Sequence, residues 1–82
     1  MNRTKAIIES KGTYISFIYG KNSTTIYERN FRGLIDSYTT KEHFVEMAEN
    51  MCHDFLQMEG HDWEYDSREL QRKLAIIYDN LI

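Results

Sequence analysis

The spacing of the apolar residues changes near residue 40, and this change restricts the folds that the chain can adopt. Before it, residues 13–27 are rich in β-branched and aromatic side chains, which favour the pleated surface of a strand. After it, apolar residues recur every three or four positions, as they do on one face of an α-helix. We therefore predict an α+β fold, in which amphipathic helices pack on a small antiparallel sheet.

The first half of the chain is predicted to supply the sheet. Three short antiparallel strands are expected, at residues 13–19, 24–27 and 34–38. The first two are joined by Gly20-Lys21-Asn22-Ser23, which has the composition of a four-residue hairpin loop because glycine and asparagine tolerate positive φ. Side chains alternate between the two faces of a strand, so Ile15 and Phe17 share a face and are predicted to point into the core.

The N-terminal segment has two interpretations. Residues 3–10 fit a short helix ended by Gly12, since glycine readily adopts the left-handed conformation beyond a helix end. The alternative is an edge strand around Ala6-Ile7-Ile8. Both interpretations stay open at this point.

Two amphipathic helices are predicted in the second half. Thr39 precedes Glu42 by three residues and Asp66 precedes Glu69 by three, which is the spacing of a capping box. The apolar stripe of the first helix consists of Phe44, Val45, Ala48, Met51, Cys52, Phe55, Leu56 and Met58. The stripe of the second helix consists of Leu70, Leu74, Ile77, Tyr78 and Leu81. Both stripes are predicted to pack on the sheet.

Chain length and cysteine content predict one small domain. With 82 residues the chain forms a single domain, 1–82, whose core is thin because so short a chain buries only roughly 60–65% of its surface on folding. The longest apolar run, 74–78, is far shorter than the about 18 residues of a membrane span, and no N-terminal run is long enough for a signal peptide. Cys52 is the single cysteine and cannot close an internal disulfide, so we expect a reducing cytoplasm.

Negative charge is concentrated in residues 42–66, which contain eight carboxylates and neither lysine nor arginine. Residues 1–41 hold seven bases and three acids, whereas residues 42–82 hold three bases and ten acids. This asymmetry indicates a charged partner or association between copies of the chain. Glu46 and Glu49 gain little from the helix dipole, and like charges three or four residues apart cost about 0.2–0.5 kcal/mol. An acidic binding surface is one explanation, and a face that only improves solubility is the other.

The residue patterns argue against catalysis and against a metal site. His43, His53 and His61 lie in the acidic segment, but no HxxxH motif, HExxH motif or cysteine pair accompanies them. The serines lack a nucleophile-elbow motif, and the glycines are too scattered for a phosphate-binding loop. Cys52 flanks the apolar stripe and is predicted to be a small buried hydrophobe. We therefore expect neither an enzyme nor a protein that needs a cofactor or metal.

Binding of single-stranded nucleic acid is a competing hypothesis for the basic first half. Lys11, Lys21, Arg29 and Arg32 are interleaved with aromatic residues, as on a surface that stacks against bases. However, no RNP-like motif is present, and the acidic segment would repel the phosphate backbone unless it faced away. Direct nucleic-acid binding is therefore the less favoured hypothesis.

The order of the predicted elements and the position of the acidic residues resemble a known group of proteins. Gly60-His61-Asp62-Trp63-Glu64-Tyr65-Asp66 is an acidic, tryptophan-containing stretch between the last two predicted helices. In this layout, over most of its length, the chain resembles the small phage-encoded anti-CRISPR proteins that imitate DNA. The resemblance implies a stoichiometric inhibitor in the host cytoplasm. It would occupy the basic DNA-binding groove of a host nucleic-acid-binding protein, such as a CRISPR effector nuclease.

The resemblance also implies which residues contact the partner. They are Glu46, Glu49, Asp54, Glu59, Asp62, Trp63, Glu64, Tyr65 and Asp66. Carboxylates imitate phosphates because both are anionic acceptors that match the arginine fork. The two aromatic rings would anchor the contact, and the carboxylates would steer the partner. The alternative is a self-associating or regulatory α+β module, in which the basic sheet of one copy meets the acidic helices of another.

Overall fold

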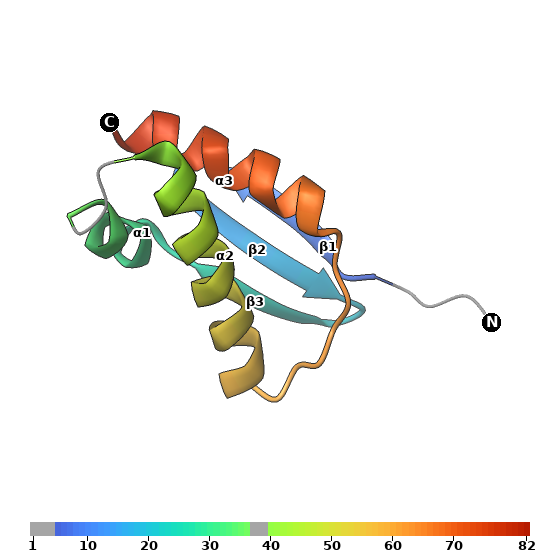
Figure 1. Ribbon diagram of the computed structural model, residues 1–82. Coiled ribbons are helices and arrows are strands. Elements are labelled where there is room, and N and C mark those ends of the chain that lie inside the picture. Colours follow the sequence, from blue (N-terminus) through green and yellow to red (C-terminus); the bar gives the residue numbers. More distant parts are fainter. Residues whose placement is uncertain (1–4, 37–39) are drawn as a thin grey trace.

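The computed structural model describes residues 5–36 and 40–82, and it contains a three-stranded antiparallel sheet with helices packed against one face (Figure 1). The elements in chain order are β1 (Ile7–Lys11), β2 (Tyr14–Tyr19), β3 (Asn22–Ile26), α1 (Glu28–Ile35), α2 (Lys41–Met58) and α3 (Ser67–Leu81). The predicted α+β fold is confirmed. None of the helices in these ranges is long and apolar enough to span a lipid bilayer.

Both hairpins have two-residue loops. Gly12 and Gly20 occupy the first loop position with φ of +61° and +62°, as a type II′ turn requires. Tyr19 pairs directly with Asn22, so the predicted four-residue loop is wrong. A glycine at the first position makes the shorter turn accessible, and strand pairing then continues through Asn22 and Ser23.

The sheet has one buried face and one exposed face. Ile8, Ile15, Phe17 and Ile26 are at most 2% exposed and point toward the helices. The inward orientation of Ile15 and Phe17 is therefore confirmed. The alternation in β1, with Ile8 buried and Ile7 61% exposed, shows an edge strand, so the helix interpretation of residues 3–10 is wrong for the described part.

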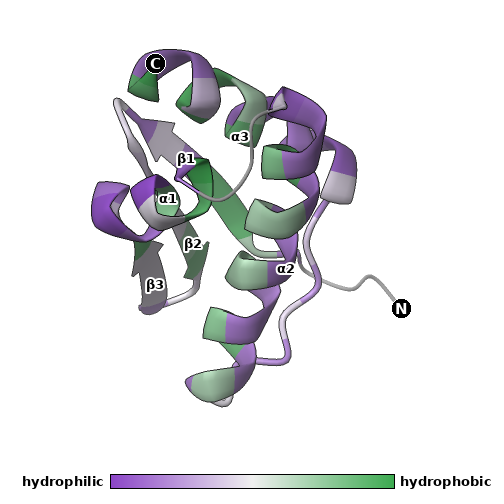
Figure 2. Ribbon diagram, turned by 60° about the vertical axis from the view of Figure 1, so that its left-hand side comes forward, coloured by the Kyte–Doolittle hydropathy of each residue, from purple (hydrophilic) through white to green (hydrophobic). Residues whose placement is uncertain are grey.

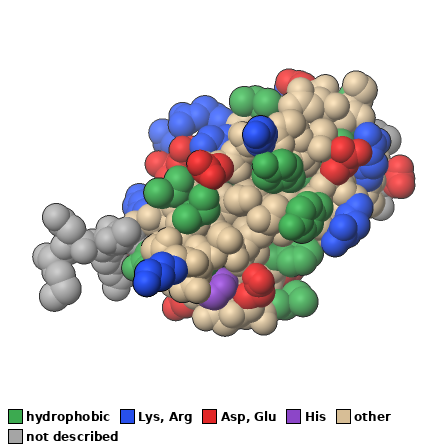
Figure 3. All heavy atoms as spheres, turned by 180° about the vertical axis from the view of Figure 1, so that it is seen from behind, with side chains coloured by type: hydrophobic (Ala, Val, Ile, Leu, Met, Phe, Trp, Pro, Cys, Tyr) green, Lys and Arg blue, Asp and Glu red, His purple; other side chains and the backbone are tan. Residues whose placement is uncertain are grey.

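The exposed face of the sheet has a mixed character. Tyr14 is 36% exposed, and the Ser16 and Thr25 hydroxyls hydrogen-bond across the strands at 2.9 Å. Figure 3 shows the molecule from behind, where hydrophobic side chains alternate with charged side chains of both signs. This face is therefore neither a continuous apolar surface nor a basic one.

The third strand predicted at 34–38 is wrong, because Leu34 and Ile35 belong to helix α1 and residues 37–39 lie outside the described residues. The sheet obtains its third strand from β1 instead. Helix α1 begins after Tyr27, whose backbone N–H donates to Asn30 Oδ1 at 3.1 Å. Phe31 is fully buried and packs against Phe44 of α2. Residues 31, 34 and 35 have the spacing of one helix face, and this spacing favours a helix over a strand here.

Helices α2 and α3 are confirmed in position. Thr40 caps α2 by accepting a hydrogen bond from the His43 N–H at 3.2 Å, while the predicted cap, Thr39, lies outside the described residues. Asp66 caps α3 as predicted, accepting from the backbone N–H groups of Arg68 and Glu69 at 3.0 and 3.1 Å. The last helix buries Leu70, Leu74, Ile77 and Leu81.

Only part of the predicted α2 stripe lies in the core. The buried row consists of Phe44, Ala48, Cys52 and Leu56. Met51 and Phe55 are half-buried and Met58 is 80% exposed. The hydropathy-coloured ribbon shows the apolar positions in a row along α2, down to an end that extends beyond the sheet (Figure 2). The helix therefore has two adjacent apolar rows. One is fully buried, and Met51 and Phe55 of the other pack against the margin of the core.

Candidate protein-binding surface

Part of the predicted acidic surface lines a groove between α2 and α3. The groove has a volume of about 730 Å³, and Glu42, Glu46 and Glu49 lie on its α2 wall. Arg68 and Arg72 lie on the opposite wall, and Val45 and Ala75 also contribute to the lining. The Glu49 carboxylate accepts a hydrogen bond from Gln71 Nε2 at 3.0 Å. This acidic row therefore lines the same groove as two arginines of the chain, an arrangement that was not predicted from the sequence.

Asp54 lies on a different side of α2. At about 100° per residue it is displaced roughly 140° around the helix from Glu49. Its side chain is exposed. Asp54 is therefore remote from the groove and from the arginines of α3.

Residues 59–66 cross the end of the sheet and contact each strand region in turn. The Glu59 carboxylate accepts a hydrogen bond from the Thr24 hydroxyl of β3 at 2.7 Å. Trp63 stacks on Tyr19 of β2, with ring centroids 5.4 Å apart. The Glu64 carbonyl accepts from the Ala6 N–H, just before β1, at 2.8 Å. This segment therefore holds the two helices against the sheet.

The two predicted aromatic anchors are half-buried. Trp63 lies between Tyr19 and His61, whose ring is 4.0 Å away and nearly parallel. Tyr65 meets Phe17 edge to face at 5.4 Å, and its burial, with a smaller effect from the Glu49 charge, raises the pKa of the phenol. Both rings pack on the core, so each has a structural role that does not depend on a partner.

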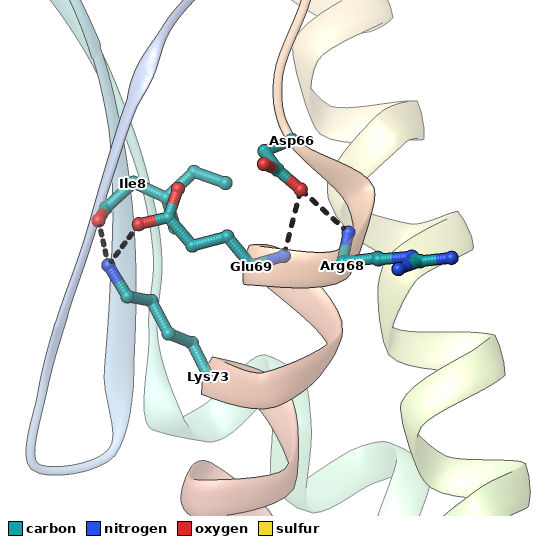
Figure 4. A network of polar contacts seen from close by, with 5 residues as sticks. All are labelled: Ile8, Asp66, Arg68, Glu69 and Lys73. Carbon is teal, nitrogen blue, oxygen red and sulfur yellow. Dashed lines mark hydrogen bonds and ion pairs between the residues drawn. The ribbon is translucent and has the colours of Figure 1, made fainter.

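Asp66 also has a structural role. Its two bonds to the first turn of α3 are visible in Figure 4. The bond from the Glu69 N–H, followed by smaller effects that include the Arg68 N–H, lowers the pKa of the Asp66 carboxyl. Asp62, by contrast, is exposed. The nine residues predicted to contact a partner are thus divided among the groove, the outer side of α2 and the crossing segment.

Five carboxylates of the acidic segment take part in none of the ion pairs between described residues. The described part of the chain has three, Arg32 with Glu28 at 2.6 Å, Lys41 with Asp79 at 2.9 Å and Lys73 with Glu69 at 3.1 Å. None of them involves Glu46, Glu49, Asp54, Glu59 or Asp62. Because Glu46 and Glu49 line the same groove as two arginines, the acidic groups most available to a partner are Asp54, Glu59 and Asp62.

Cys52 is fully buried, as predicted, and burial raises the pKa of its thiol to about 12. Within residues 5–36 and 40–82, no three or more His, Cys, Asp or Glu side chains come together in a way that could hold a metal ion. On the basic half, Tyr19 is covered by Trp63 and the Arg29 guanidinium lies 5.1 Å from the Tyr27 ring centre. These aromatic rings contact other parts of the chain.

A second apolar row on α2 is formed by Met47, Met51, Phe55 and Met58. The predicted stripe contained the last three of these residues but left out Met47 and did not separate this row from the buried one. The signal was present in the spacing of four, four and three residues, parallel to the buried row. No protein-family model, curated protein or solved structure matches this chain.

Proposed function

We propose that this chain is a small protein-binding inhibitor that occupies a basic surface of its partner. The observation that supports this proposal most strongly is the absence of ion pairs at Asp54, Glu59 and Asp62 among the described residues. A segment with eight carboxylates and no base costs helix stability through repulsion between neighbouring glutamates, so a requirement other than folding accounts for it best.

The acidic groups lie on a folded support, which favours binding. The last turn of α2 ends in a Gly60 cap with φ of +75°, where the His61 N–H donates to the Leu56 carbonyl at 2.8 Å. The crossing segment is fixed to the sheet through Glu59 and Trp63. Carboxylates held in this way lose little conformational freedom when a lysine or arginine approaches, so the binding cost is low.

The more specific form of the proposal follows from the resemblance to anti-CRISPR proteins. The partner would be a nucleic-acid-binding protein, such as a CRISPR effector nuclease, in the cytoplasm of a host cell. The chain would block its DNA-binding groove by occupancy and charge and would catalyse no reaction. Arginine-rich grooves that bind phosphates also bind carboxylates, since both groups accept paired hydrogen bonds.

A matched pair of charge-reversed variants tests the proposal. Asp54→Lys with Asp62→Lys changes two exposed carboxylates at the proposed surface, and Glu9→Lys with Asp36→Lys makes the same charge change elsewhere. Displacement of labelled DNA from purified CRISPR effector nucleases is measured by mobility shift. We expect the first variant to weaken inhibition at least about tenfold and the second by less than about twofold.

Salt dependence and mass complete the test. Inhibition should weaken as salt rises from about 50 mM to 500 mM, because the contact is electrostatic and exposed. Full inhibition by the Asp54→Lys, Asp62→Lys variant would contradict the proposal. A wild-type chain that displaces no DNA and forms a salt-sensitive oligomer would favour the self-associating module instead.

A further inference from the structure

The outer edge of β3 has unpaired backbone groups. A two-residue hairpin loop closes on a hydrogen-bonded pair, here Tyr19 and Asn22, so Asn22, Thr24 and Ile26 direct their backbone groups to β2. Ser23 and Thr25 therefore direct theirs away from the sheet. Within the described ranges 5–36 and 40–82, these outward groups have no hydrogen-bond partner. An unpaired edge of this kind is a template for another strand.

The second apolar row of α2 lies above this edge. Helix α3 packs over β1 and α2 over β3, so the side of α2 that faces away from α3 lies toward and beyond the β3 edge (Figures 1 and 2). This side presents Met51 and Phe55, which are half-buried, and Met58, which is 80% exposed. A strand placed beside β3 would cover these side chains.

Acidic groups border the same place. The Glu59 carboxylate is bonded to Thr24, in the middle of β3, and Asp54 lies on the side of α2 that faces away from the groove. The edge, the apolar row and these two carboxylates therefore place backbone donors and acceptors, apolar side chains and negative charge beside one another.

We propose that the partner contributes an extended segment that adds a fourth strand beside β3. Every second side chain of that segment would point toward α2. Among these inward side chains, apolar residues would pack against Met51, Phe55 and Met58, and lysine or arginine would reach Glu59 and Asp54. This inference depends on the proposed function, since it describes how the basic partner is held.

A second copy of the chain fits the β3 edge less well. Antiparallel pairing of β3 with β3 of another copy, centred on the middle of the strand, would bring two Thr24 residues together near a two-fold axis. Each Thr24 holds a Glu59 carboxylate at 2.7 Å, so two negative charges would approach each other without a base between them. Charge complementarity therefore favours a basic segment of a different protein.

The probe is a fluorescent nine-residue peptide. Threonine occupies every odd position, and the four even positions carry isoleucine, lysine, lysine and isoleucine. Binding is measured by fluorescence anisotropy.

Ser23→Pro removes one outward N–H and leaves the β2–β3 bonds intact, because proline is tolerated where a strand N–H faces outward. We expect Ser23→Pro to weaken binding at least about tenfold and Ser23→Ala by less than about twofold. Met58→Lys, at an exposed position, should weaken binding about fivefold through lost apolar contact and repulsion.

Two measurements keep the test independent of whether Ser23→Pro folds. Amide hydrogen exchange at Ser23 and Thr25 in the wild-type chain should slow at least about tenfold when the peptide is added. N-methylation of one alternate set of peptide residues should abolish binding, while methylation of the other set changes it by less than about twofold, because only one edge of the added strand faces β3.

The outcomes separate this inference from the proposed function. One outcome is that exchange at Ser23 and Thr25 does not change, while binding is still lost in the Asp54→Lys, Asp62→Lys variant. This outcome would overturn strand addition but would not contradict the acidic binding surface. Binding insensitive to both changes would contradict both. A dimer of the chain itself, disrupted by Ser23→Pro and competing with the peptide in sedimentation, would also overturn the inference, since the occupant would be a second copy.

Discussion

The two edges of the sheet differ in how many hydrogen bonds they receive from the rest of the chain. At the β1 edge, the Ala6 N–H donates to Glu64 at 2.8 Å, Lys73 Nζ donates to the Ile8 carbonyl and Asn80 Nδ2 donates to the Gly12 carbonyl at 2.8 Å. Figure 4 shows Lys73 reaching the strand from α3. The outward backbone groups of β3 have no comparable partners in the described part of the chain.

This difference shows which residues cover part of the β1 edge, while the β3 edge is left available. Lysine directed at an edge carbonyl prevents a further strand from pairing, and natural proteins protect edges in this way. The chain uses the C-terminal helix and the crossing segment for the β1 edge. At the β3 edge, the end of α2 lies nearby, and its second apolar row does not occupy the hydrogen-bonding groups of the strand. Three variants can weaken or sharpen this comparison.

The largest effect is expected from Tyr65→Ala. The ring of Tyr65 packs edge to face on Phe17 and fixes the crossing segment beside β1. Its removal leaves a cavity next to a fully buried ring, and we expect a loss of about 2–3 kcal/mol in the free energy of unfolding. Urea denaturation measures the loss. Tyr65→Phe keeps the ring and should change stability by less than about 0.5 kcal/mol.

If Tyr65→Ala and Tyr65→Phe are equally stable, the crossing segment is not needed to close the β1 edge. In that case the difference between the two edges would depend on α3 alone. Amide exchange at Ala6, which should become faster in Tyr65→Ala, distinguishes the two situations.

A smaller effect is expected from Lys73→Met. Lys73 is partly buried and donates to both the Ile8 carbonyl and the Glu69 carboxylate. Loss of a charged donor to a strand carbonyl should destabilise the fold by about 1–2 kcal/mol. Lys21→Met, at the exposed β2–β3 loop, is the matched control and should have an effect below about 0.5 kcal/mol. Lys73→Met should also aggregate more readily on mild heating, because the β1 edge is opened. Equal stability and solubility of Lys73→Met and Lys21→Met would contradict the idea that Lys73 protects the β1 edge.

The smallest effect is expected from Asp66→Asn, and it appears only as a change in pH dependence. The backbone bonds from Glu69 and Arg68 keep the folded pKa of Asp66 below its unfolded value. The stabilisation is therefore complete above the unfolded pKa, near pH 4, and is lost as pH falls through the folded pKa. Asparagine also caps helices but does not titrate.

Thermal melts between pH 2 and 7 should consequently show a shallower acid dependence for Asp66→Asn than for the wild-type chain. Some dependence should persist, because the hydrogen bond from Thr13, followed by that from Arg32, lowers the pKa of Glu28 as well. Identical melting curves at every pH would show that the Asp66 cap does not contribute to acid stability.

Two locally repeating patterns were predicted correctly. The α3 stripe and its Asp66 cap depend on residues three or four positions apart, and the inward face of β2 depends on simple alternation. Less of the candidate surface could be predicted. The acidic residues were identified correctly as a feature of composition, but their division between the groove, the outer side of α2 and the crossing segment depends on how α2 packs.

The sequence alone determined the α+β class, the two long helices, the β2 strand and the accumulation of carboxylates in residues 42–66, because each is a property of neighbouring residues. Only the tertiary structure decided that β1 rather than residues 34–38 completes the sheet. It also decided which apolar row of α2 is fully buried and that Lys73 binds a carbonyl of the β1 edge 65 positions away in the sequence. These outcomes depend on contacts between distant segments, which compete for the same buried surface and hydrogen-bonding groups and leave no mark in local spacing.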